Sequence, residues 1–467
     1  MSNSKTHIFI FPYPAQGHML PLLDLTHQLA LQSTFTITII VTPKNLPILT
    51  PLLSTHPNTI KTLIFPFPSH PKIPSDVENL REIGNPGNYP FINALSNLQN
   101  PIIQWFNIHH NPPVALISDF FLGWTQQLAT QLNIPRIAFY SSGAFLTAVI
   151  NRCWRNPLFF QSQEVVEFNE IHGTPSFKRD HLPSLFRRYV ESDPESEFVK
   201  ESFISNDESW GFVINTFSAL EGGYLDNIEG QFGNRRLFAV GPLGYDRVGS
   251  DLEDGSDVLR WLDRWDEDGS VLYVCFGSQK LMRRDQMEAL AFGLERSGIR
   301  FVWVVKVPST VEQIEEGYGL VPEGFEDWVS GRGIVVKGWV PQIAILGHRV
   351  VGGFLSHCGW NSVLEAVVAG VGILGWPMEA DQFVNAKLLV EDMGVAVRVC
   401  EGMDTVPDPN KLGRVISSIM SGDSPQKKRA KLMKEEALRA VSKDGVSSKE
   451  LNELVHALQQ LGVKERS

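Results

Sequence analysis

The sequence predicts an α/β protein made of two doubly wound, Rossmann-like domains that face one another across a cleft. First, the 467 residues exceed what one hydrophobic core usually serves. Second, short β-rich apolar runs alternate with helical periodicity, which requires parallel sheets with right-handed crossovers. Third, a polar, Gly- and Asp-rich stretch interrupts this alternation once, at residues 244–257, after which it restarts.

The first half of the chain predicts six strands and at least two helices. Helical periodicity covers Leu20–Leu31 and Thr125–Gln131. The expected strands are His7–Phe11, Thr36–Val41, Thr62–Phe65, Val114–Ile117, Arg136–Phe139 and Phe212–Ile214. We expect residues 1–243 to form the first domain and residues 244–257 to be the interdomain linker.

The second half repeats the pattern as a second domain, expected over residues 258–448. Its predicted strands are Val271–Phe276, Phe301–Val305, Ile334–Lys337, Gly353–Leu355 and Val371–Leu374, and its helices are Asp285–Arg296 and Trp360–Val368. A last helical segment, Glu450–Leu461, lies within residues 449–467 and is expected to follow this domain, with a return to the first domain left open. Ligands of such sheets bind at the carboxyl ends of the strands.

Composition argues against nucleic acid and against an integral membrane protein. The net charge is −11, whereas a nucleic-acid partner requires a basic face. The one basic run, Lys427 to Lys434, has helical spacing that favours a solvated helix face. No apolar stretch reaches the ~18 residues of a spanning helix. The opening MSNSKTHIFIFPYP is not typical of a secretory signal, and the four cysteines form no CxxC, so we expect a cytoplasmic protein, which we take to be a monomer.

Two segments of the second half have the residues needed to bind a diphosphate. Gly277-Ser278 follows a strand, as phosphate-binding turns do, although an ordinary turn has the same pattern. The run from Gly353 to Ser362 reads as strand, glycine turn and helix start. There His357, Asn361 and Ser362 have hydrogen-bond donors, and Glu365 lies one turn further on, where it can accept ribose hydroxyls. A helix cap at Ser362 and a core histidine at position 357 remain the alternative.

Three other chemistries fit less well. Adjacent residues at a strand end point to opposite sides, so His357 and Cys358 do not form a base–nucleophile pair. The acidic triplet Asp266-Glu267-Asp268 precedes a strand instead of following one, which disfavours a metal-dependent transferase, and no His/Cys cluster has zinc spacing. The turn after the first strand, PYPAQGH, lacks the GxGxxG of a dinucleotide dehydrogenase.

The whole segment from Trp339 to Gln382 is far more specific than its parts. It reads WVPQIAILGHRVVGGFLSHCGWNSVLEAVVAGVGILGWPMEADQ and resembles the 44-residue signature of plant secondary-product UDP-glycosyltransferases, a family with the GT-B fold. Gly17-His18, Asp119, Val240-Gly241-Pro242 and Phe276-Gly277-Ser278 also fit that family, so the resemblance covers essentially the whole chain.

The resemblance implies that residues 1–243 bind the acceptor and that residues 258–448 bind the UDP-sugar donor. It also implies roles for the matching residues. Trp339 stacks on uracil, the backbone around Val340 with Gln342 holds its edge and the ribose, and Glu365 binds the ribose hydroxyls. The other implied donor contacts are those to the diphosphate (Ser278, His357, Asn361, Ser362) and those to the sugar (Trp360, Asp381, Gln382, and Ser141 where relatives often have Thr). The co-substrate is then a UDP-sugar, most simply UDP-glucose, with no metal required.

His18 and Asp119 form the implied catalytic pair. A phenolic or alcoholic hydroxyl is a poor nucleophile at neutral pH, and a histidine is suited to take its proton. Asp119 would orient the imidazole and stabilise its cation, and UDP would leave with inversion at the anomeric carbon. A protein that binds a UDP-sugar without turnover is the alternative, and the presence of both residues disfavours it.

The acceptor is expected to be a small, flat, largely apolar molecule with a few hydroxyls. An aromatic-rich set of side chains is predicted to line its pocket, although several of them are expected to be core: Tyr89, Phe91, Phe120, Phe121, Leu122, Phe145, Trp154, Phe198 and Phe203. Glu379 is expected near the pocket mouth or at a solvated rim. The segments VTPKNLP and DFFLGW resemble enzymes acting on flavonoids and simple phenolics. A flavonoid-like phenol is therefore the expected acceptor, with other aromatic or terpenoid alcohols as the alternative.

Overall fold

The structure is a computed structural model that describes residues 5–233, 235–245, 256–308, 310–422 and 424–464. The chain divides into two compact units: unit 1 is Met1–Gly244 with Arg439–Ser467, and unit 2 is Tyr245–Leu438. Most of the predicted linker, residues 246–255, lies outside the described residues.

Unit 1 contains a seven-stranded sheet in which every neighbouring pair is parallel, in the order β3-β2-β1-β4-β5-β8-β9. All residues of β1, β4, β5 and β8 are buried, as expected for a parallel sheet covered by helices on both faces. The strands are β1 Thr6–Phe11, β2 Phe35–Val41, β3 Ile60–Ile64, β4 Ala115–Asp119, β5 Arg136–Tyr140, β8 Gly211–Ile214 and β9 Arg236–Ala239. All six predicted strands are confirmed, and β9 is added at the edge.

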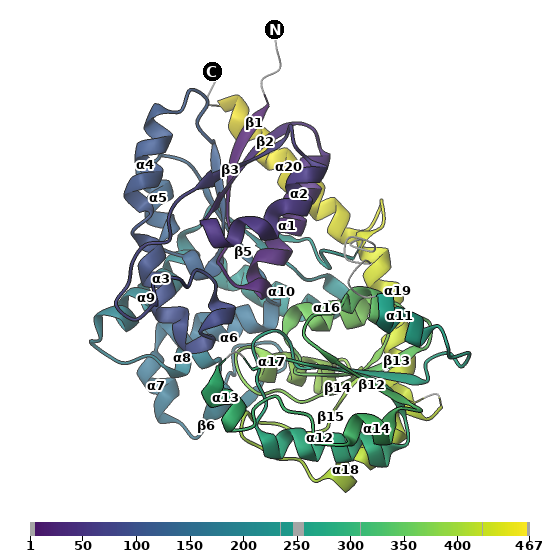
Figure 1. Ribbon diagram of the computed structural model, residues 1–467. Helices are drawn as coiled ribbons and strands as arrows, with labels where there is room; N and C mark the ends of the chain where they lie inside the picture. The colour runs from purple at the N-terminus through teal and green to yellow at the C-terminus, as the bar shows by residue number, and fades with distance from the viewer. Residues whose placement is uncertain (1–4, 234, 246–255, 309, 423, 465–467) are drawn as a thin grey trace. The chain divides into compact units, whose positions relative to one another are not determined.

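Helices cover both faces of this sheet (Figure 1). The helices of unit 1 are α1 Gln16–Leu31, α2 Thr50–Thr55, α3 Asn88–Ser96, α4 Gln99–Ile108, α5 Thr125–Gln131, α6 Ala144–Arg155, α7 Pro157–Ser162, α8 Ser184–Arg187, α9 Pro194–Ser205, α10 Ser218–Phe232 and α20 Val446–Lys464. Short 3₁₀ turns are η1 Pro43–Leu49, η2 Leu80–Glu82, η3 Asn85–Gly87, η4 Phe120–Leu122, η5 Arg179–His181 and η6 Asn206–Glu208. A small antiparallel hairpin, β6 Val165–Glu167 and β7 Ser176–Lys178, stands apart from the sheet.

The last helix, α20, packs on unit 1, against β1 and β9. Leu454, Val455 and Leu458 are at most 7% exposed and belong to the same core cluster as β1 and α1. The return to unit 1 begins at Arg439, inside α19 Pro425–Val441, whereas the sequence placed the end of the second domain at residue 448. Helix α19 continues across this boundary, so no break in the helical pattern of the sequence marks the boundary.

Unit 2 has a six-stranded parallel sheet in the order β12-β11-β10-β13-β14-β15. Its strands are β10 Val271–Cys275, β11 Arg300–Val305, β12 Gly333–Lys337, β13 Val351–Ser356, β14 Gly372–Gly375 and β15 Ala396–Arg398. The five predicted strands are confirmed, and the short edge strand β15 was not predicted.

The core of unit 2 lies between this sheet and helices that include α12 and α18, and it contains the buried Trp303 and Trp376. Figure 1 shows α12, α14 and α18 on one side of the sheet and α11 and α16 on the other. The helices are α11 Ser256–Leu262, α12 Arg284–Ser297, α13 Val311–Glu315, α14 Phe325–Val329, α15 Gln342–Leu346, α16 Trp360–Ala369, α17 Gln382–Lys387, α18 Pro409–Met420 and α19, with a π-helical turn at Leu388–Asp392.

Each sheet has one point at which the strand order reverses. In unit 1 this switch point lies between β1 and β4, and in unit 2 between β10 and β13. The connections on the two sides of a switch point leave the sheet in opposite directions and open a crevice at the carboxyl ends of the strands. The predicted catalytic and diphosphate-binding residues all follow these four strands.

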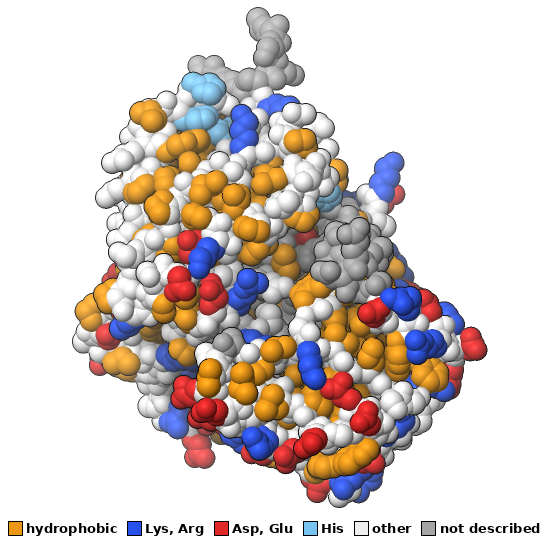
Figure 2. Space-filling view, in the orientation of Figure 1, with side chains coloured by type: hydrophobic (Ala, Val, Ile, Leu, Met, Phe, Trp, Pro, Cys, Tyr) orange, Lys and Arg blue, Asp and Glu red, His pale blue; other side chains and the backbone are white. Residues whose placement is uncertain are grey.

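Basic and acidic side chains lie on the same face of the molecule, and the absence of a nucleic-acid partner stays a prediction. On the face shown in Figure 2, basic and acidic side chains of the described residues are interspersed, without a continuous basic stripe. The basic run from Lys427 lies on α19, where Lys427 and Lys434 donate to the backbone carbonyls of Met420 and Ala369. Among the described residues, no helix combines the length and apolar character needed to span a bilayer. The cytoplasmic location and the monomer stay predictions.

Candidate active site

His18 and Asp119 lie next to each other at the switch point of unit 1. β1 pairs with β4 in a register that places Phe11 beside Ser118, so the first turn of α1 meets the end of β4. His18 Nδ1 is 3.0 Å from Asp119 Oδ2 and 3.1 Å from Oδ1. The carboxylate is fully buried and also accepts a 2.9 Å hydrogen bond from the backbone N–H of Phe121. Because Nδ1 is engaged, Nε2 is the nitrogen left to exchange a proton with another molecule.

Aromatic rings surround the imidazole of His18. Phe120 stacks on it at 5.6 Å between ring centroids, Phe121 meets it edge-on at 4.4 Å, and Tyr13 meets it edge-on at 5.3 Å. Burial and the charge of Asp119 raise the pKa of Tyr13, so its phenol stays protonated and donates to Asn88 Oδ1 at 2.7 Å. The sequence analysis missed Tyr13, although its place in the turn after β1 is a usable signal.

Ser141 also contacts the imidazole. It follows β5, and its Oγ lies 3.2 Å from His18 Nδ1. The resemblance assigned this residue to the sugar, whereas the contact seen here is with the catalytic pair.

A buried arginine organises the end of β4. Arg136, at the start of β5, is 1% exposed, and its Nε donates to Ser118 Oγ and Thr125 Oγ1, both at 2.8 Å. Its Nη1 donates to Asn206 Oδ1 at 2.9 Å and to Ser209 Oγ at 2.8 Å. Burial lowers its pKa to about 10, which still leaves the guanidinium charged at neutral pH.

These hydrogen bonds continue into the turn that bears the catalytic carboxylate. Arg136 Nη2 lies 3.4 Å from the carbonyl oxygen of Asp119, and Asn206 donates to the carbonyl of Phe120 at 2.9 Å. The network therefore fixes the turn that holds Asp119. The sequence analysis missed it, although a charged residue at the start of an apolar strand was the available signal.

In unit 2, His357 occupies the turn after β13. A Cβ atom on Gly277 or Gly359 would lie 2.8 Å or 2.6 Å from His357 Nε2, so only glycine leaves room for the ring. Burial lowers the pKa of His357 to about 4, so the ring is neutral at neutral pH. Its buried Nδ1 has no hydrogen-bond partner within the described chain. A neutral imidazole with an unpaired nitrogen is suited to a hydrogen bond with a ligand.

The N-terminus of α16 follows this turn and is open to an anion. Its N-cap, Gly359, contributes no side-chain cap, and no acidic residue occupies the first turn. The positive end of the helix dipole at this turn therefore favours an anion such as a diphosphate. Asn361 and Ser362 lie in this first turn. The N-cap is Gly359, so Ser362 does not cap the helix, as the alternative interpretation required. Ser278 is exposed in the turn after β10.

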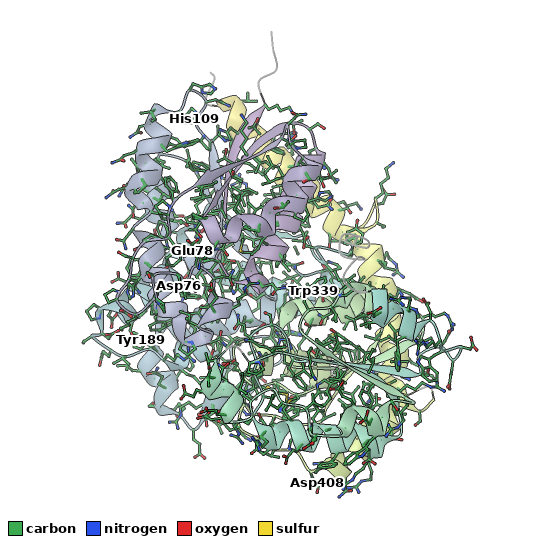
Figure 3. The ribbon with its side chains drawn as sticks, in the orientation of Figure 1. Asp76, Glu78, His109, Tyr189, Trp339 and Asp408 are labelled. Carbon is green, nitrogen blue, oxygen red and sulfur yellow. The ribbon has the colours of Figure 1, made fainter. Side chains whose placement is uncertain are left out.

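The predicted nucleoside-binding residues are also brought together. Gln342 Nε2 donates to Glu365 Oε2 at 2.6 Å and to Ser362 Oγ at 3.1 Å. The buried Tyr273 hydroxyl donates to Gln342 Oε1 at 3.1 Å and so fixes the orientation of the amide. Tyr273 was not predicted as a site residue, because its position within the apolar strand β10 indicates a core residue. Val340 is buried, whereas Trp339 is 51% exposed (Figure 3).

The predicted sugar-binding residues lie around the start of α17. Asp381 Oδ2 accepts a 2.6 Å hydrogen bond from Asn385. Gln382 Oε1 accepts from the backbone N–H groups of Met378 and Glu379, which holds the loop before α17 in place. Trp360, at the first position of α16, is 4% exposed.

Among the predicted acceptor residues, Phe120, Phe121 and Phe203 form one aromatic cluster with Trp154. Phe203 lies 5.2 Å from Phe121 and 5.3 Å from Trp154, between ring centroids. This cluster is continuous with the ring contacts of His18. A role of its rings in acceptor binding stays a prediction.

The remaining predicted acceptor residues have other surroundings. Phe145 stacks on Tyr224 at 4.2 Å in a separate group of rings, and Phe91 packs against Phe67. Tyr89 is buried and donates to the carbonyl of Leu185. Leu122 is fully buried, and Phe198 is half-buried on α9.

Glu379 is half-buried in unit 2. Burial lowers the pKa of Lys280, and the negative charge of Glu379 opposes this shift. Lys280 is therefore a cation close to the Glu379 carboxylate. The expected effect of Glu379 on acidic acceptors stays a prediction.

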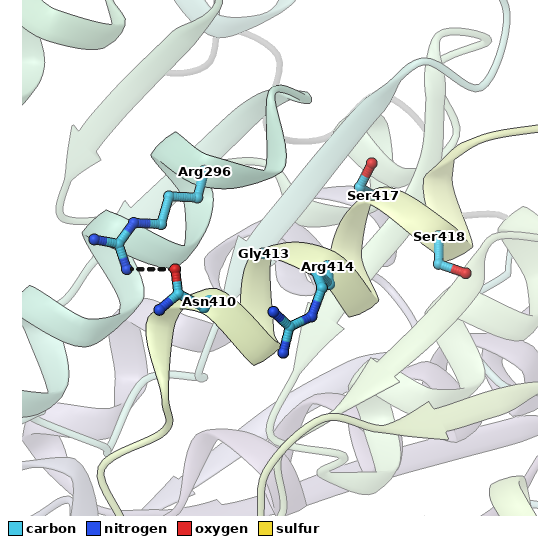
Figure 4. Close-up of a pocket in the computed structure, with 6 residues that line it drawn as sticks. All are labelled: Arg296, Asn410, Gly413, Arg414, Ser417 and Ser418. Carbon is cyan, nitrogen blue, oxygen red and sulfur yellow. Dashed lines mark hydrogen bonds between the residues drawn. The ribbon is translucent and has the colours of Figure 1, made fainter.

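A separate pocket of about 630 Å³ lies between α12 and α18 of unit 2 (Figure 4). Arg296 donates to Asn410 Oδ1 at 3.0 Å across it. None of its lining residues belongs to the predicted site. Within the described residues, no group of three or more His, Cys, Asp or Glu side chains is arranged to hold a metal ion.

Two parallel α/β sheets, one with a His–Asp pair at its switch point and the other with an anion-binding turn, define a nucleotide-sugar transferase of the GT-B class. Solved structures agree with this class. Arabidopsis thaliana UGT89C1 in complex with UDP-L-rhamnose has a TM-score of 0.80 and 36% identity, over 97% of this chain and 99% of that chain. Its complex with quercetin has a TM-score of 0.79 and 35% identity over the same shares.

Sequence comparison identifies the family. Residues 257–420 match the family described as UDP-glucoronosyl and UDP-glucosyl transferase. UDP-glycosyltransferase 89A2 of Arabidopsis thaliana is 52% identical over 90% of this chain and 88% of that protein. Flavonol 3-O-glucosyltransferase UGT89B1 of the same plant is 47% identical over 98% of each chain. The chain belongs to the plant family of UDP-glycosyltransferases, and it transfers a sugar from a UDP-sugar donor.

Trp339→Ala is expected to weaken UDP binding without weakening the fold. Stacking of a base on an aromatic ring contributes about 1–3 kcal/mol, so the Kd for UDP should rise about 5-fold to 150-fold. Trp328→Ala is the matched control, since Trp328 is 63% exposed in the same unit and outside the site. Calorimetric titration with UDP checks both variants, and equal affinities would remove Trp339 from the nucleotide site.

Proposed function

We propose that the enzyme transfers glucose from UDP-glucose to a hydroxyl of a flavonoid-like phenol, with inversion at the anomeric carbon. The observation that supports this proposal most directly is the His18–Asp119 pair. Its fully buried carboxylate contacts Nδ1 of an imidazole that aromatic rings surround. This arrangement combines a base with an apolar environment suited to a flat acceptor.

In the proposed reaction, His18 Nε2 takes the proton of the acceptor hydroxyl while the acceptor oxygen attacks the anomeric carbon. The bond between that carbon and the β-phosphate oxygen breaks, and UDP leaves with the bonding electrons. A single displacement of this kind inverts the configuration. Asp119 stabilises the imidazolium that forms, and Ser141 contacts the same ring nitrogen.

Unit 2 provides the groups that stabilise the departing UDP. The charge that develops on the diphosphate meets the open N-terminus of α16 and the neutral imidazole of His357. We assign the diphosphate to His357, Asn361, Ser362 and Ser278, and the ribose to Glu365, which Gln342 orients.

The glucose assignment is supported by Trp360 and Gln382, which match the family's usual pattern for that sugar. The relative named flavonol 3-O-glucosyltransferase supports it further. The alternative sugar is rhamnose, because UGT89C1 was solved with UDP-L-rhamnose at 36% identity. The two hexoses differ in stereochemistry and at C6, and a site discriminates strongly against a missing hydroxyl only if it hydrogen-bonds that group.

The phenolic acceptor is supported by the aromatic cluster beside His18 and by the relatives. UGT89C1 was solved with the flavonol quercetin, and UGT89B1 is named for a flavonol. Stacked and edge-on rings around the base suit a planar aromatic acceptor better than a saturated one.

We further propose that no metal ion takes part. Helix α16 and neutral donors face the diphosphate in place of a cation, so turnover should be unchanged when EDTA is added. Parallel assays with EDTA alone and with EDTA plus excess Mg²⁺ check this. A loss of activity that Mg²⁺ restores would contradict the proposal.

A matrix of donors and acceptors tests the function. UDP-glucose, UDP-galactose, UDP-rhamnose and UDP-xylose are each combined with flavonols, hydroxybenzoates, terpenols and sterols, and products are read by mass. The fastest turnover is expected for UDP-glucose with a flavonol, and NMR of the product should show the β-glucoside that inversion of the α-linked donor gives.

The outcomes separate the parts of the proposal. Best turnover with another donor would overturn the glucose assignment alone. Products from terpenols or sterols only would overturn the phenolic assignment, and an α-glucoside would overturn inversion.

A further inference from the structure

We propose that Asn385 is a positioning residue that ties the sugar-binding carboxylate of Asp381 to the turn at His357–Gly359 and so fixes this carboxylate for recognition of the sugar. The proposal rests on the proposed role of Asp381 in holding the sugar. Asn385 lies three residues beyond the signature segment that ends at Gln382.

The contacts of Asn385 carry the proposal. Asn385 is only 2% exposed. Its amide Nδ2 donates to Asp381 Oδ2 at 2.6 Å and to the carbonyl of Cys358 at 2.9 Å. An amide nitrogen has two hydrogens, and both are used here. One nitrogen therefore connects the start of α17 to the turn between β13 and α16.

The turn that Asn385 holds has an uncommon backbone conformation. Cys358 has φ = +66°, the left-handed region that few residues other than glycine adopt. Its N–H donates to Ser356 Oγ at 3.1 Å, and its Sγ packs so closely on Gly375 that a Cβ there would lie 3.0 Å away. Asn385 engages the remaining polar group of this residue, its carbonyl. On either side of Cys358, His357 is proposed to bind the diphosphate and Gly359 is the N-cap of α16.

Asp381 does not cap the helix at whose start it lies. It occupies the N-cap position of α17, but its φ of −84° and ψ of −7° are helical, and its side chain makes no cap hydrogen bond. One carboxylate oxygen instead accepts from Asn385, four residues later on the same helix face. Without Asn385 this hydrogen bond is lost, and the carboxylate is expected to be less well fixed.

Asn385→Ala is therefore expected to impair use of the sugar nucleotide more than binding of the nucleotide. Loss of an orienting partner behind a ligand residue typically costs about 10-fold to 100-fold, so kcat/KM for UDP-glucose should fall by this factor. The Kd for UDP, which has no sugar, should change by less than about 3-fold, because Ser356 and Gly375 still hold the turn. Asn410→Ala, an exposed asparagine on α18, is the control and should change neither quantity.

A double-mutant cycle distinguishes positioning from a general structural role. In an Asp381→Ala background, Asn385→Ala should have little further effect on kcat/KM, since the group that it positions is gone. Asn385→Ser, which keeps one donor, is the second variant and should retain more activity than Asn385→Ala. Thermal unfolding of each variant shows whether it is folded.

Each outcome decides between the alternatives. Additive effects in the cycle, or an equal loss of UDP affinity and kcat/KM in folded Asn385→Ala or Asn385→Ser, would overturn the positioning role. If Asp381→Ala alone leaves kcat/KM for UDP-glucose unchanged, the proposed sugar contact of Asp381 fails instead. Should neither Asn385 variant fold, the residue serves the fold and the proposal is also overturned.

Discussion

His18→Ala is expected to lower kcat by about 10²-fold to 10⁴-fold, the usual contribution of one proton-transfer group. The imidazole is the titratable group at the carboxyl end of β1, and its Nδ1 is held by Asp119 at 3.0 Å, so Nε2 has a defined position. Binding of UDP should not change, since the donor residues belong to unit 2. Turnover with a flavonol and calorimetry with UDP measure the two expectations separately.

His27→Ala is the matched control for this prediction. His27 lies on the same helix, 2.8 Å from His56 and outside the site, so its removal should leave kcat within about 3-fold. An active His18→Ala enzyme, tested with a phenol of ordinary pKa, would overturn the base mechanism. Strongly acidic phenols are not informative, because they ionise without a base.

Arg136→Met is expected to lower the free energy of unfolding by at least about 3 kcal/mol, because each buried polar group left without its partner costs about 1–3 kcal/mol. The guanidinium is the donor to two hydroxyls on one side, Ser118 and Thr125, and to Asn206 and Ser209 on the other. Methionine fills a similar volume but donates nothing.

Urea unfolding of the wild type, Arg136→Met and Arg235→Met checks this prediction. Arg235 is exposed and donates to the carbonyl of Ser209, so its loss removes one neighbouring hydrogen bond without burying an unpaired group. We expect a change below about 1 kcal/mol for Arg235→Met. Equal effects of the two substitutions would show that the buried network adds little stability.

The central strands were predictable because both faces of a parallel sheet are covered. Runs such as Ile8–Phe11 and Val271–Phe276 are apolar throughout, and the helices between them have an apolar face at helical spacing. Helix α5 was predicted with the bounds that it has, Thr125–Gln131. With the sheets predicted, the carboxyl ends of β1, β4, β10 and β13 were predicted as ligand-binding positions.

The edge strands β9 and β15 and the boundary between the units were not predictable in the same way. β9 and β15 have four and three residues and are stabilised by pairing with one neighbour, not by their own pattern. The division of the chain at residue 438 falls within a continuous helix, so the contacts of α20 define it.

Within the site, the sequence pointed to residues that are proposed to touch ligand and missed those behind them. His18, Asp119 and Glu365 were predicted from motif and position. Arg136 and Asn385 were missed, because their roles depend on partners that the fold brings close. The partners of Arg136 lie 11 to 73 residues away in the chain, and those of Asn385 lie 4 and 27 residues away. The sequence contains two signals that could have pointed to them. They are a charged residue at the start of the apolar strand β5 and an asparagine four residues after Asp381.

The contribution of α20 to unit 1 has a consequence for synthesis on the ribosome. Ile8 and Leu22 share a core with Leu454 and Leu458, so the hydrophobic surface of the first unit stays partly uncovered until almost the whole chain has been made. Unit 2, which is continuous from Tyr245 to Leu438, has all of its residues earlier. Domains usually fold in order from the N-terminus during translation. Here the unit that begins the chain is the one whose folding can be completed only after the last helix leaves the ribosome.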